Sequence, residues 1–354
     1  MFKAVVKYGV ILSCFIYLSH ADQAMDSKKT VFGKEDKASS EERTASSKKS
    51  IAFDIFYKGW QAQNDEQYKK AMEFYKRAAI EGCSVAQFHI GHLYENGLGV
   101  SENHEKAFKW YSKIAEDGYV KAQAILAQMY SLGRGVEQDY NKAFYWYKQA
   151  ADQGDITAQL ATAKMYENAK GVHKSLVKSI AYYKKAIDQG SREAMTSLSL
   201  LYMNNKEMKK YFENGKKLLK RSAKKGEVKA QYYLSQLYLK GEVFKKDYKK
   251  GLQWLKKSAD QGYAEAQYAI AKIYIDQEKL SGNYDEAVAY MKKSALQNYA
   301  SAQYDLGLMY YEGLGVTEDK AQTFKYWSSA SKLGDKDAKH NLKILCKSFP
   351  DVCK

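Results

Sequence analysis

A glycine that recurs every 36 residues constrains the fold of this chain more than any other feature of its sequence. It stands at positions 82, 118, 154, 190, 226, 262 and 334, and asparagine replaces it at 298. An alanine lies four residues after each of these positions, and a tyrosine lies eight residues after the alanine in every repeat but the last. No insertion or deletion shifts this frame. The period predicts an array of similar units, each packed against its neighbours in the sequence.

Each repeat carries the signals of two helices. The recurrent glycine follows an amphipathic run, where a helix must end in a left-handed residue, and asparagine also tolerates that conformation. The recurrent alanine starts a buried stripe that continues at helical spacing through positions such as Ile90, Gly91 and Tyr94. A Gly-Leu-Gly-Val turn comes next, at residues 97–100. We therefore expect a helix, a glycine turn, a second helix and a glycine stop in every unit.

The second helix of each repeat has a start signal of its own. Residues with N-capping side chains stand three positions after the turn: Asn103, Asp139, Ser175, Asp247, Asn283 and Asp319. Tyr211 is the exception. The turns at 205–207 and 277–279 lack both glycines and should differ in shape. Because Pro350 is the only proline, the helices should run without interruption between turns.

Three concurrent patterns point to a known family: Ala-Gln-x-x-Leu-Gly-x-Met-Tyr, Gly-x-Gly-Val and Ala-x-x-Trp-Tyr-x-x-Ala-Ala-x-x-Gly. Together they resemble the Sel-one-like repeat, a branch of the tetratricopeptide-like helical solenoids. Residues 302–310 and 143–151 are close matches, and the resemblance covers about residues 50 to 345. It implies an all-α, right-handed α/α solenoid of about eight 36-residue helix-turn-helix repeats with a C-terminal capping helix. Residues 51–345 would form this array, and residues 346–354 a C-terminal tail.

The resemblance also implies a function. Bacterial members of this family are often exported and act as adaptors that bind envelope proteins or host-cell proteins. Some cysteine-rich relatives resemble penicillin-binding or β-lactamase proteins, but this chain lacks their helix-linking cysteine pairs. The expected partners are therefore proteins, and neither a cofactor nor a small-molecule substrate is expected.

Residues 1–21 have the pattern of a secretory signal peptide. Lys3 and Lys7 supply positive charge, residues 8–18 form a short apolar run, and Ala21 ends a small-x-small cleavage site. This pattern predicts a secreted or periplasmic protein cleaved after Ala21. The alternative is a membrane protein anchored by an uncleaved N-terminal segment. Residues 22–50 are rich in Lys, Ser, Asp and Glu and should form a disordered leader.

Cysteine and histidine offer few candidates for chemistry. Cys346 and Cys353 flank Pro350, and a local disulfide there would suit an oxidising compartment, although the spacing alone leaves free thiols open. Cys83 should be exposed and free, with pairing to a partner or a second copy as the alternative. His89 and His92 lie three apart on one helix, but no third ligand accompanies them, so no metal site is expected.

Positive charge is concentrated in one segment. The chain has a net charge of +16, and residues 206–257 contain 17 basic and 5 acidic side chains. Six of the basic residues cluster within one helix and its end: Lys216, Lys217, Lys220, Arg221, Lys224 and Lys225. They form either a solvated face that aids solubility or a site for an acidic protein, anionic lipid or polyanionic polymer. Export argues against nucleic acid.

A second candidate surface follows from the first helices, which line the concave side of related solenoids. Their positions outside the core hold Phe88, His89, His92, Tyr232, Tyr233, Tyr268 and Tyr304. Aromatic side chains on a concave surface often anchor a binding partner, but a role in packing explains these residues almost as well.

Catalysis has little support in the sequence. Ser-x-x-Lys occurs at 222–225 and 329–332, which is background in a lysine-rich chain, and no phosphate loop or nucleophile elbow is present. We therefore expect an exported adaptor that is not an enzyme. The alternatives are an envelope enzyme or regulator of peptidoglycan enzymes, related to the cysteine-rich branch, and an adaptor of a eukaryotic secretory pathway.

Overall fold

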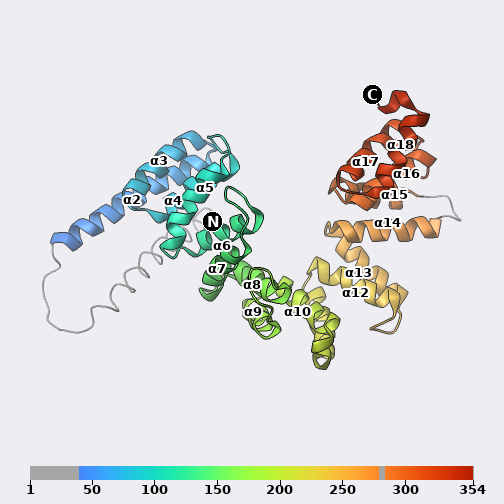
Figure 1. Ribbon diagram of the computed structural model, residues 1–354, viewed down its shortest axis with the longest axis horizontal. Helices are drawn as coiled ribbons and strands as arrows, with labels where there is room; N and C mark the ends of the chain where they lie inside the picture. Colours follow the sequence, from blue (N-terminus) through green and yellow to red (C-terminus); the bar gives the residue numbers. More distant parts are fainter. Residues whose placement is uncertain (1–39, 279–283, 354) are drawn as a thin grey trace, which may run out of the picture. The chain divides into compact units, whose positions relative to one another are not determined.

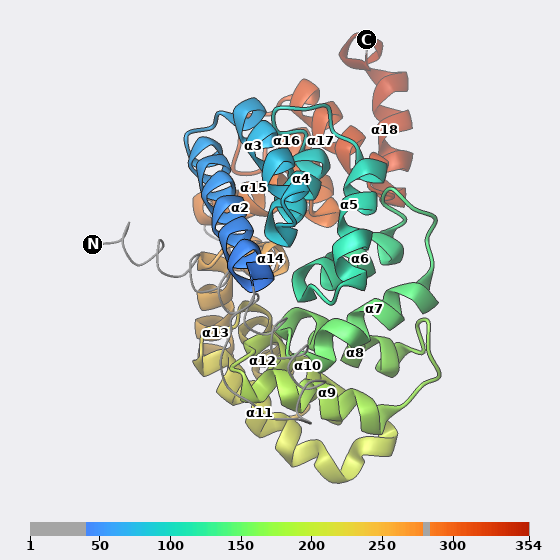
Figure 2. The same cartoon turned by 90° about the vertical axis from the view of Figure 1, so that its left-hand side faces the viewer.

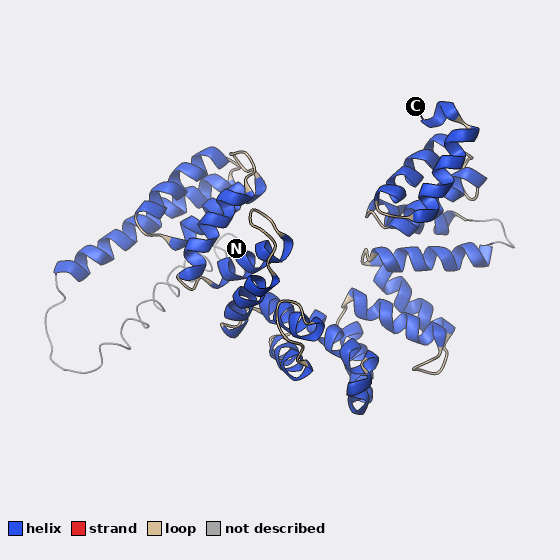
Figure 3. Cartoon of the chain, in the orientation of Figure 1, coloured by secondary structure: helices blue, strands red, loops and turns tan. Residues whose placement is uncertain are grey.

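The computed structural model describes residues 40–278 and 284–353, and this part of the chain is all helix and short turns, without a β-strand (Figures 1 and 3). The first helices of the repeats are α2 (Ser40–Asn64), α4 (Ser84–Asn96), α6 (Val120–Leu132), α8 (Ile156–Asn168), α10 (Arg192–Asn204), α12 (Val228–Lys240), α14 (Ala264–Glu278), α16 (Ala300–Glu312) and α18 (Lys336–Ser348). The second helices are α3 (Tyr68–Ile80), α5 (His104–Glu116), α7 (Tyr140–Asp152), α9 (Leu176–Asp188), α11 (Phe212–Lys224), α13 (Tyr248–Asp260), α15 (Asp285–Leu296) and α17 (Lys320–Lys332). The predicted all-α repeat array is confirmed.

The chain divides into two compact units. The N-terminal unit ends at Tyr182 and the C-terminal unit begins at Tyr183, so the boundary lies within α9. In each unit, helices that follow one another in the sequence pack side by side. Figure 2 shows this for α3, α4 and α5 of the N-terminal unit.

The recurrent glycine has the conformation that its position predicts. In all seven repeats that carry it, the backbone φ angle lies between +85° and +99°, and Asn298 adopts +61°. The N-caps also form as expected. The side chains of Asn103, Asp139, Asp247 and Asp319 accept hydrogen bonds from backbone amides in the first turn of their helices. Asn283 lies outside the described residues.

Small residues on the first helices allow the second helices to approach closely. A Cβ atom at Gly91 would stand 2.8 Å from the ring of Tyr111. A Cβ atom at Gly307 would stand 2.5 Å from the ring of Trp327. Both aromatic side chains are buried, so any larger residue at these glycines would displace part of the core.

A ladder of buried glutamines links successive helices. Gln123, Gln231 and Gln303 each donate a side-chain hydrogen bond to the carbonyl of the alanine eight residues earlier, at the end of the preceding second helix. The oxygens of Gln123 and Gln231 accept in turn from Gln153 and Gln261, at 2.8 and 2.7 Å. These bonds give a further donor to carbonyl groups that already accept from a turn amide, that of Gly118, Gly226 or Asn298.

The start of the array differs from the expected boundary. Helix α2 begins at Ser40, inside the segment 22–50 that we expected to be a disordered leader. Residues 40–50 contain Glu, Arg, Ala and Lys, which favour helix, and they continue without a break into the stripe that buries Ala52 and Phe56. The predicted signal peptide and residues 22–39 lie outside the described residues. Within the described residues, no helix is long and apolar enough to cross a membrane.

Of the two turns without glycine, the one after α10 is irregular, and residues 279–283 of the other lie outside the described residues. A 3₁₀ helix, η1 (Lys206–Tyr211), replaces the glycine turn between α10 and α11. Helix α14 continues to Glu278 and has 15 residues, where most of the first helices have 13.

Two of the three cysteines among the described residues are joined by a disulfide. Cys346 and Cys353 form a disulfide with 5.6 Å between their Cα atoms. This bond joins α18 to a second 3₁₀ helix, η2 (Pro350–Cys353), which contacts α17 as well as α18. Cys83 is half-buried at the N-terminus of α4, against the cluster that includes Phe56 and Ile90, whereas we expected it to be exposed.

Candidate binding surface

The aromatic residues of the first helices pack on one another across repeats. The ring centroids of Phe88 and Tyr119 are 5.5 Å apart in the N-terminal unit. In the C-terminal unit the corresponding pairs are Tyr232–Tyr263, at 5.4 Å, and Tyr268–Tyr299, at 5.2 Å. In each pair, one ring comes from a first helix and the other from the residue just before the next first helix. Tyrosine recurs at 119, 263 and 299 in the sequence, which is the signal from which this unexpected pairing could be predicted.

The tyrosines of the predicted groove also form hydrogen bonds or ring contacts with other residues of the array. The Tyr268 hydroxyl donates to Asp305 at 3.0 Å, and burial raises the pKa of Tyr268. The Tyr304 hydroxyl accepts a hydrogen bond from Asn341 at 3.0 Å. Tyr233 packs on Tyr232, with ring centroids 5.7 Å apart. All are half-buried, so much of their surface contributes to the array itself.

His89 and His92 are part of the packing of the N-terminal unit. The His89 ring stacks on Tyr75 at 4.9 Å, and its Nδ1 lies 3.2 Å from Gln63 Oε1. Burial lowers the pKa of His89 to about 4, with smaller contributions from His92 and Lys121. Its neutral form is therefore the relevant one near neutral pH. Among the described residues, no three His, Cys, Asp or Glu side chains are grouped to hold a metal ion.

The six basic residues of the predicted patch fall into separate environments around α11. Lys216 and Lys220 are half-buried, with their ammonium groups 5.3 and 4.3 Å from the ring centroid of Phe244. Lys216 also pairs with Glu213 at 2.9 Å. These two lysines cover apolar surface and stabilise the contact with the next repeat. Lys224 and Lys225 are exposed at the C-terminal end of the helix.

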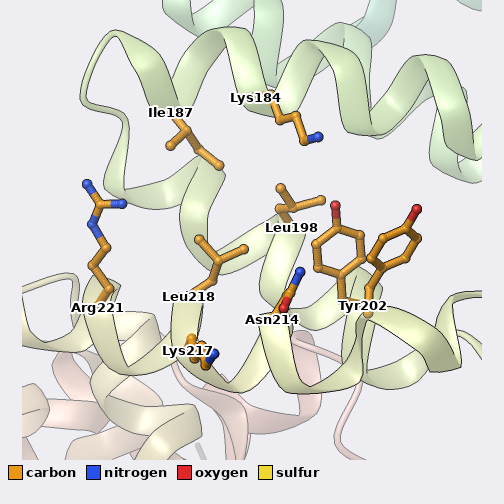
Figure 4. A pocket seen from close by; sticks show the side chains of 9 residues that line it. Lys184, Ile187, Leu198, Tyr202, Asn214, Lys217, Leu218 and Arg221 are labelled. Carbon is orange, nitrogen blue, oxygen red and sulfur yellow. The ribbon is translucent and has the colours of Figure 1, made fainter.

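Lys217 and Arg221 lie on a different side of α11 and face a pocket (Figure 4). This pocket, the α11 pocket, has a volume of about 400 Å³ and lies entirely within the C-terminal unit. Nine residues line it: Lys184, Ile187, Leu198, Tyr202, Tyr211, Asn214, Lys217, Leu218 and Arg221. They come from α9, α10, η1 and α11, which the sequence spacing alone did not bring together.

The α11 pocket has an apolar interior and a cationic rim. Ile187, Leu198 and Leu218 project toward one another from three helices in Figure 4. Lys184, Lys217 and Arg221, the cationic rim, are all exposed. In the part of the chain that the structure describes, none of the three forms a salt bridge with a carboxylate. The fold therefore leaves these three charges available to a ligand.

Leu218 explains why the pocket exists at this repeat. The equivalent position of every other second helix holds an aromatic residue: Phe74, Trp110, Trp146, Tyr182, Trp254, Tyr290 and Tyr326. Where this residue is tyrosine, its ring packs on the recurrent tyrosine of the first helix of the same repeat. The centroids are 6.0 Å apart for Tyr166–Tyr182 and 5.8 Å apart for Tyr310–Tyr326. Leu218 has no ring to occupy this space.

Tyr211, which stands where the other repeats have a capping residue, forms another wall of the pocket. It precedes α11 without a side-chain capping bond, and its ring stacks on Tyr202 with 5.0 Å between centroids. Burial, with a smaller contribution from Tyr211, raises the pKa of Tyr202. Position 211 therefore lacks a capping side chain and instead contributes a tyrosine ring to the pocket.

The Ser-x-x-Lys motif beside the pocket has a packing role. Ser222 is fully buried and its hydroxyl donates to the carbonyl of Arg192 at 2.9 Å. Thr196 lies 3.0 Å from the same hydroxyl and donates to Glu227 at 2.8 Å. A buried serine held in this way is not exposed to a substrate.

Comparison with known proteins gives a consistent result. The family model described as Sel1 repeat matches residues 52–83, 84–119, 120–155, 156–191, 228–263, 264–299 and 300–335. The repeat at residues 192–227, which contains η1 and most of the α11 pocket, is absent from these matches. No curated protein sequence matches the chain.

Several solved structures are similar. A Sel1 repeat protein from Oxalobacter formigenes is 28% identical, over 89% of this chain and 95% of that one, with a TM-score of 0.65. A protective antigen present in uropathogenic Escherichia coli strains, displaying an SLR fold, is 26% identical over 87% of this chain and 67% of that one, with a TM-score of 0.59. Yeast Tom70 is 12% identical over 91% of this chain and 66% of that one, with a TM-score of 0.52, a likeness of fold alone.

Proposed function

Because this chain belongs to the Sel1 repeat family, whose repeats are typical of scaffolds for protein–protein interaction, we propose that it binds an acidic partner protein through the cationic rim of the α11 pocket. A repeat fold does not by itself identify a partner, and the residues that the fold does not need are the ones that can select it. The observation that carries the proposal is the group of three exposed, unpaired cations Lys184, Lys217 and Arg221 around an open apolar pocket.

The charge of the surrounding segment supports an acidic partner. Residues 206–257 contain 17 basic and 5 acidic side chains, and the partner would meet this field before it meets the pocket. Lys216 and Lys220 contribute to the field but are already engaged with Phe244. The rim residues, by contrast, can pair with carboxylates without breaking an existing contact. Complementary charge of this kind raises the association rate and makes binding depend on salt.

We also propose that the protein acts outside the cytoplasm. The pattern of residues 1–21 favours export, and a disulfide between Cys346 and Cys353 suits an oxidising compartment. Host interaction belongs to the same proposal and is supported only by analogy with exported members of the family. Fractionation of the native cells, with the mass of the mature N-terminus, tests export: a cytoplasmic protein that retains residues 1–21 would contradict it.

The binding proposal is tested with poly-glutamate as the acidic probe. A variant with Lys184→Glu, Lys217→Glu and Arg221→Glu should bind the probe about tenfold more weakly than the unaltered protein at low salt, a loss of roughly 1.4 kcal/mol. The difference should shrink as salt increases, because exposed charges are screened. Titration calorimetry or fluorescence anisotropy measures both effects.

Helix α18 offers a matched control. Lys336, Lys339 and Lys343 are also exposed cations of the C-terminal unit, and their reversal changes the net charge by the same amount. This control should keep most of the affinity. Equal losses in the two variants would show that binding follows net charge alone, and the proposed role of the rim would be wrong.

A further inference from the structure

We infer that the α11 pocket receives an aromatic side chain, preferably tyrosine, from an acidic segment of a partner protein. This inference rests on the proposed function and adds to it the chemical identity of the residue that enters the pocket. It follows from what the other repeats place at the same position.

The pocket corresponds to the space that an aromatic ring fills elsewhere in the array. Seven second helices carry an aromatic residue where α11 carries Leu218. Tyr290, in the same unit, shows the usual arrangement, with its ring centroid 6.1 Å from that of Tyr274. Tyr202 is the counterpart of Tyr274, and it lines the α11 pocket together with Tyr211, whose ring stacks on it with 5.0 Å between centroids. A ring supplied from outside would therefore meet an aromatic surface of the kind that the chain uses internally.

The hydroxyl of an incoming tyrosine would also find a suitable acceptor. Tyr182 donates its hydroxyl to Asp152 at 2.7 Å, and Tyr290 donates to Asp260 at 2.7 Å. The acceptor lies 30 residues before the tyrosine in both cases, and the equivalent residue before Leu218 is Asp188. Asp188 is exposed and follows the lining residue Ile187, outside the nine lining residues, and leucine offers it no hydroxyl. This acceptor favours tyrosine over phenylalanine.

The size and the charge of the site agree with this occupant. Its volume of about 400 Å³ lies within the range of about 300–1,000 Å³ that is typical of ligand sites in proteins. Lys184 lies on α9, across the pocket from Lys217 and Arg221 on α11. Carboxylates on both sides of the aromatic residue can therefore pair with the rim while the ring enters the pocket. An anchoring ring within a charged frame is a common arrangement at protein interfaces.

Two synthetic peptides test the inference with the full-length protein. One has a single tyrosine between Asp and Glu residues, and the other has serine in place of the tyrosine. We expect the tyrosine peptide to bind about tenfold more tightly, since a buried ring with its hydrogen bond contributes on the order of a few kcal/mol before the cost of ordering it. Isothermal titration calorimetry at one fixed salt concentration measures the ratio.

Refilling the pocket provides a second measurement. Leu218→Tyr places in α11 the residue that α9, α15 and α17 carry, so this variant should fold and bind both peptides with the affinity of the serine peptide. Leu218→Ala is the matched control, because it alters the same position but leaves the pocket open. This control should keep most of the preference for tyrosine.

The outcomes separate the two proposals. Equal affinity of the two peptides would overturn the inference and leave the acidic-partner proposal standing. Failure of both peptides to bind would overturn the proposed function as well. Tight binding of free tyrosine that is insensitive to reversal of Lys184, Lys217 and Arg221 would overturn the inference in favour of a small-molecule site.

Discussion

At the scale of single residues, the same amino acid has different roles according to what lies opposite it. His89 stands at a position where other repeats have Ile125 or Ala161, and the sequence offers it as a surface residue or a metal ligand. In the structure its ring is enclosed by Phe56, Tyr75 and Phe88. Helical period places a residue on a face but does not identify the chain segment that covers that face.

The burial of His89 predicts an acid-sensitive N-terminal unit. Its pKa is about 4 in the folded chain and about 6.5 when exposed. A lowered folded-state pKa means that stability is fully present above about pH 6.5 and is lost as the pH falls toward 4, by about 3 kcal/mol in total. Amide hydrogen exchange across α2 to α4, corrected for intrinsic rates, measures this loss.

The control for this pH dependence is His89→Phe, which keeps a ring between Phe56 and Tyr75 but cannot titrate. Protection of α2 to α4 in this variant should change less between pH 6.5 and pH 4 than in the unaltered protein. If both lose protection equally, another group is responsible for the acid sensitivity.

At the scale of helices, the glutamine ladder is present in the regular repeats and is interrupted in the repeat at residues 192–227. Gln231 donates to the Ala223 carbonyl at 3.1 Å and accepts from Gln261 at 2.7 Å. At the equivalent position α10 has Met195, which can form neither bond. Met195 belongs to the same repeat as η1, Leu218 and Tyr211. Several departures from the repeat therefore occur in one repeat, as expected where function has displaced the requirements of packing.

Removing one glutamine from the ladder should lower the free energy of unfolding by a measurable amount. Gln231→Met should destabilise the repeat at residues 228–263 by about 1–2 kcal/mol, because two side-chain hydrogen bonds are lost, while the Ala223 carbonyl keeps the Gly226 amide and Gln261 keeps the Lys257 carbonyl. Hydrogen exchange of α11 to α13 or the urea midpoint of the C-terminal unit measures the effect. A change within experimental error would mean that water replaces both bonds without loss.

At the scale of the whole molecule, each of the two units consists of neighbouring repeats that contact one another in sequence order. A disturbance in one repeat should therefore remain local. The disulfide between Cys346 and Cys353 gives a test at the C-terminal end, where it holds η2 against α17 and α18.

Replacing Cys346 and Cys353 by serine should loosen the end of the array and little else. Closing so short a loop contributes about 2 kcal/mol by the loop-entropy argument. Hydrogen exchange should therefore rise in α17, α18 and η2, while α3 to α7 keep their protection. An equal rise in α3 to α7 would contradict the local character of the array.

Much of the architecture could be predicted from the sequence because the repeat supplies the same local information many times. Left-handed glycines, capping side chains and small residues at close helix contacts act over a few residues, and each repeat confirms the assignment of the others. The early start of α2 was not predicted, because its polar first turns carry no apolar stripe.

The candidate site could be identified only from the tertiary structure. The sequence alone determined the repeat, its helices and turns, and the concentration of charge in residues 206–257. Only the structure showed that Lys216 and Lys220 lie on Phe244, whereas Lys217 and Arg221 face a pocket with Lys184. The physical reason is that a helix turns by about 100° per residue, so neighbouring lysines meet different partners. Those partners come from repeats whose contacts the local sequence does not specify.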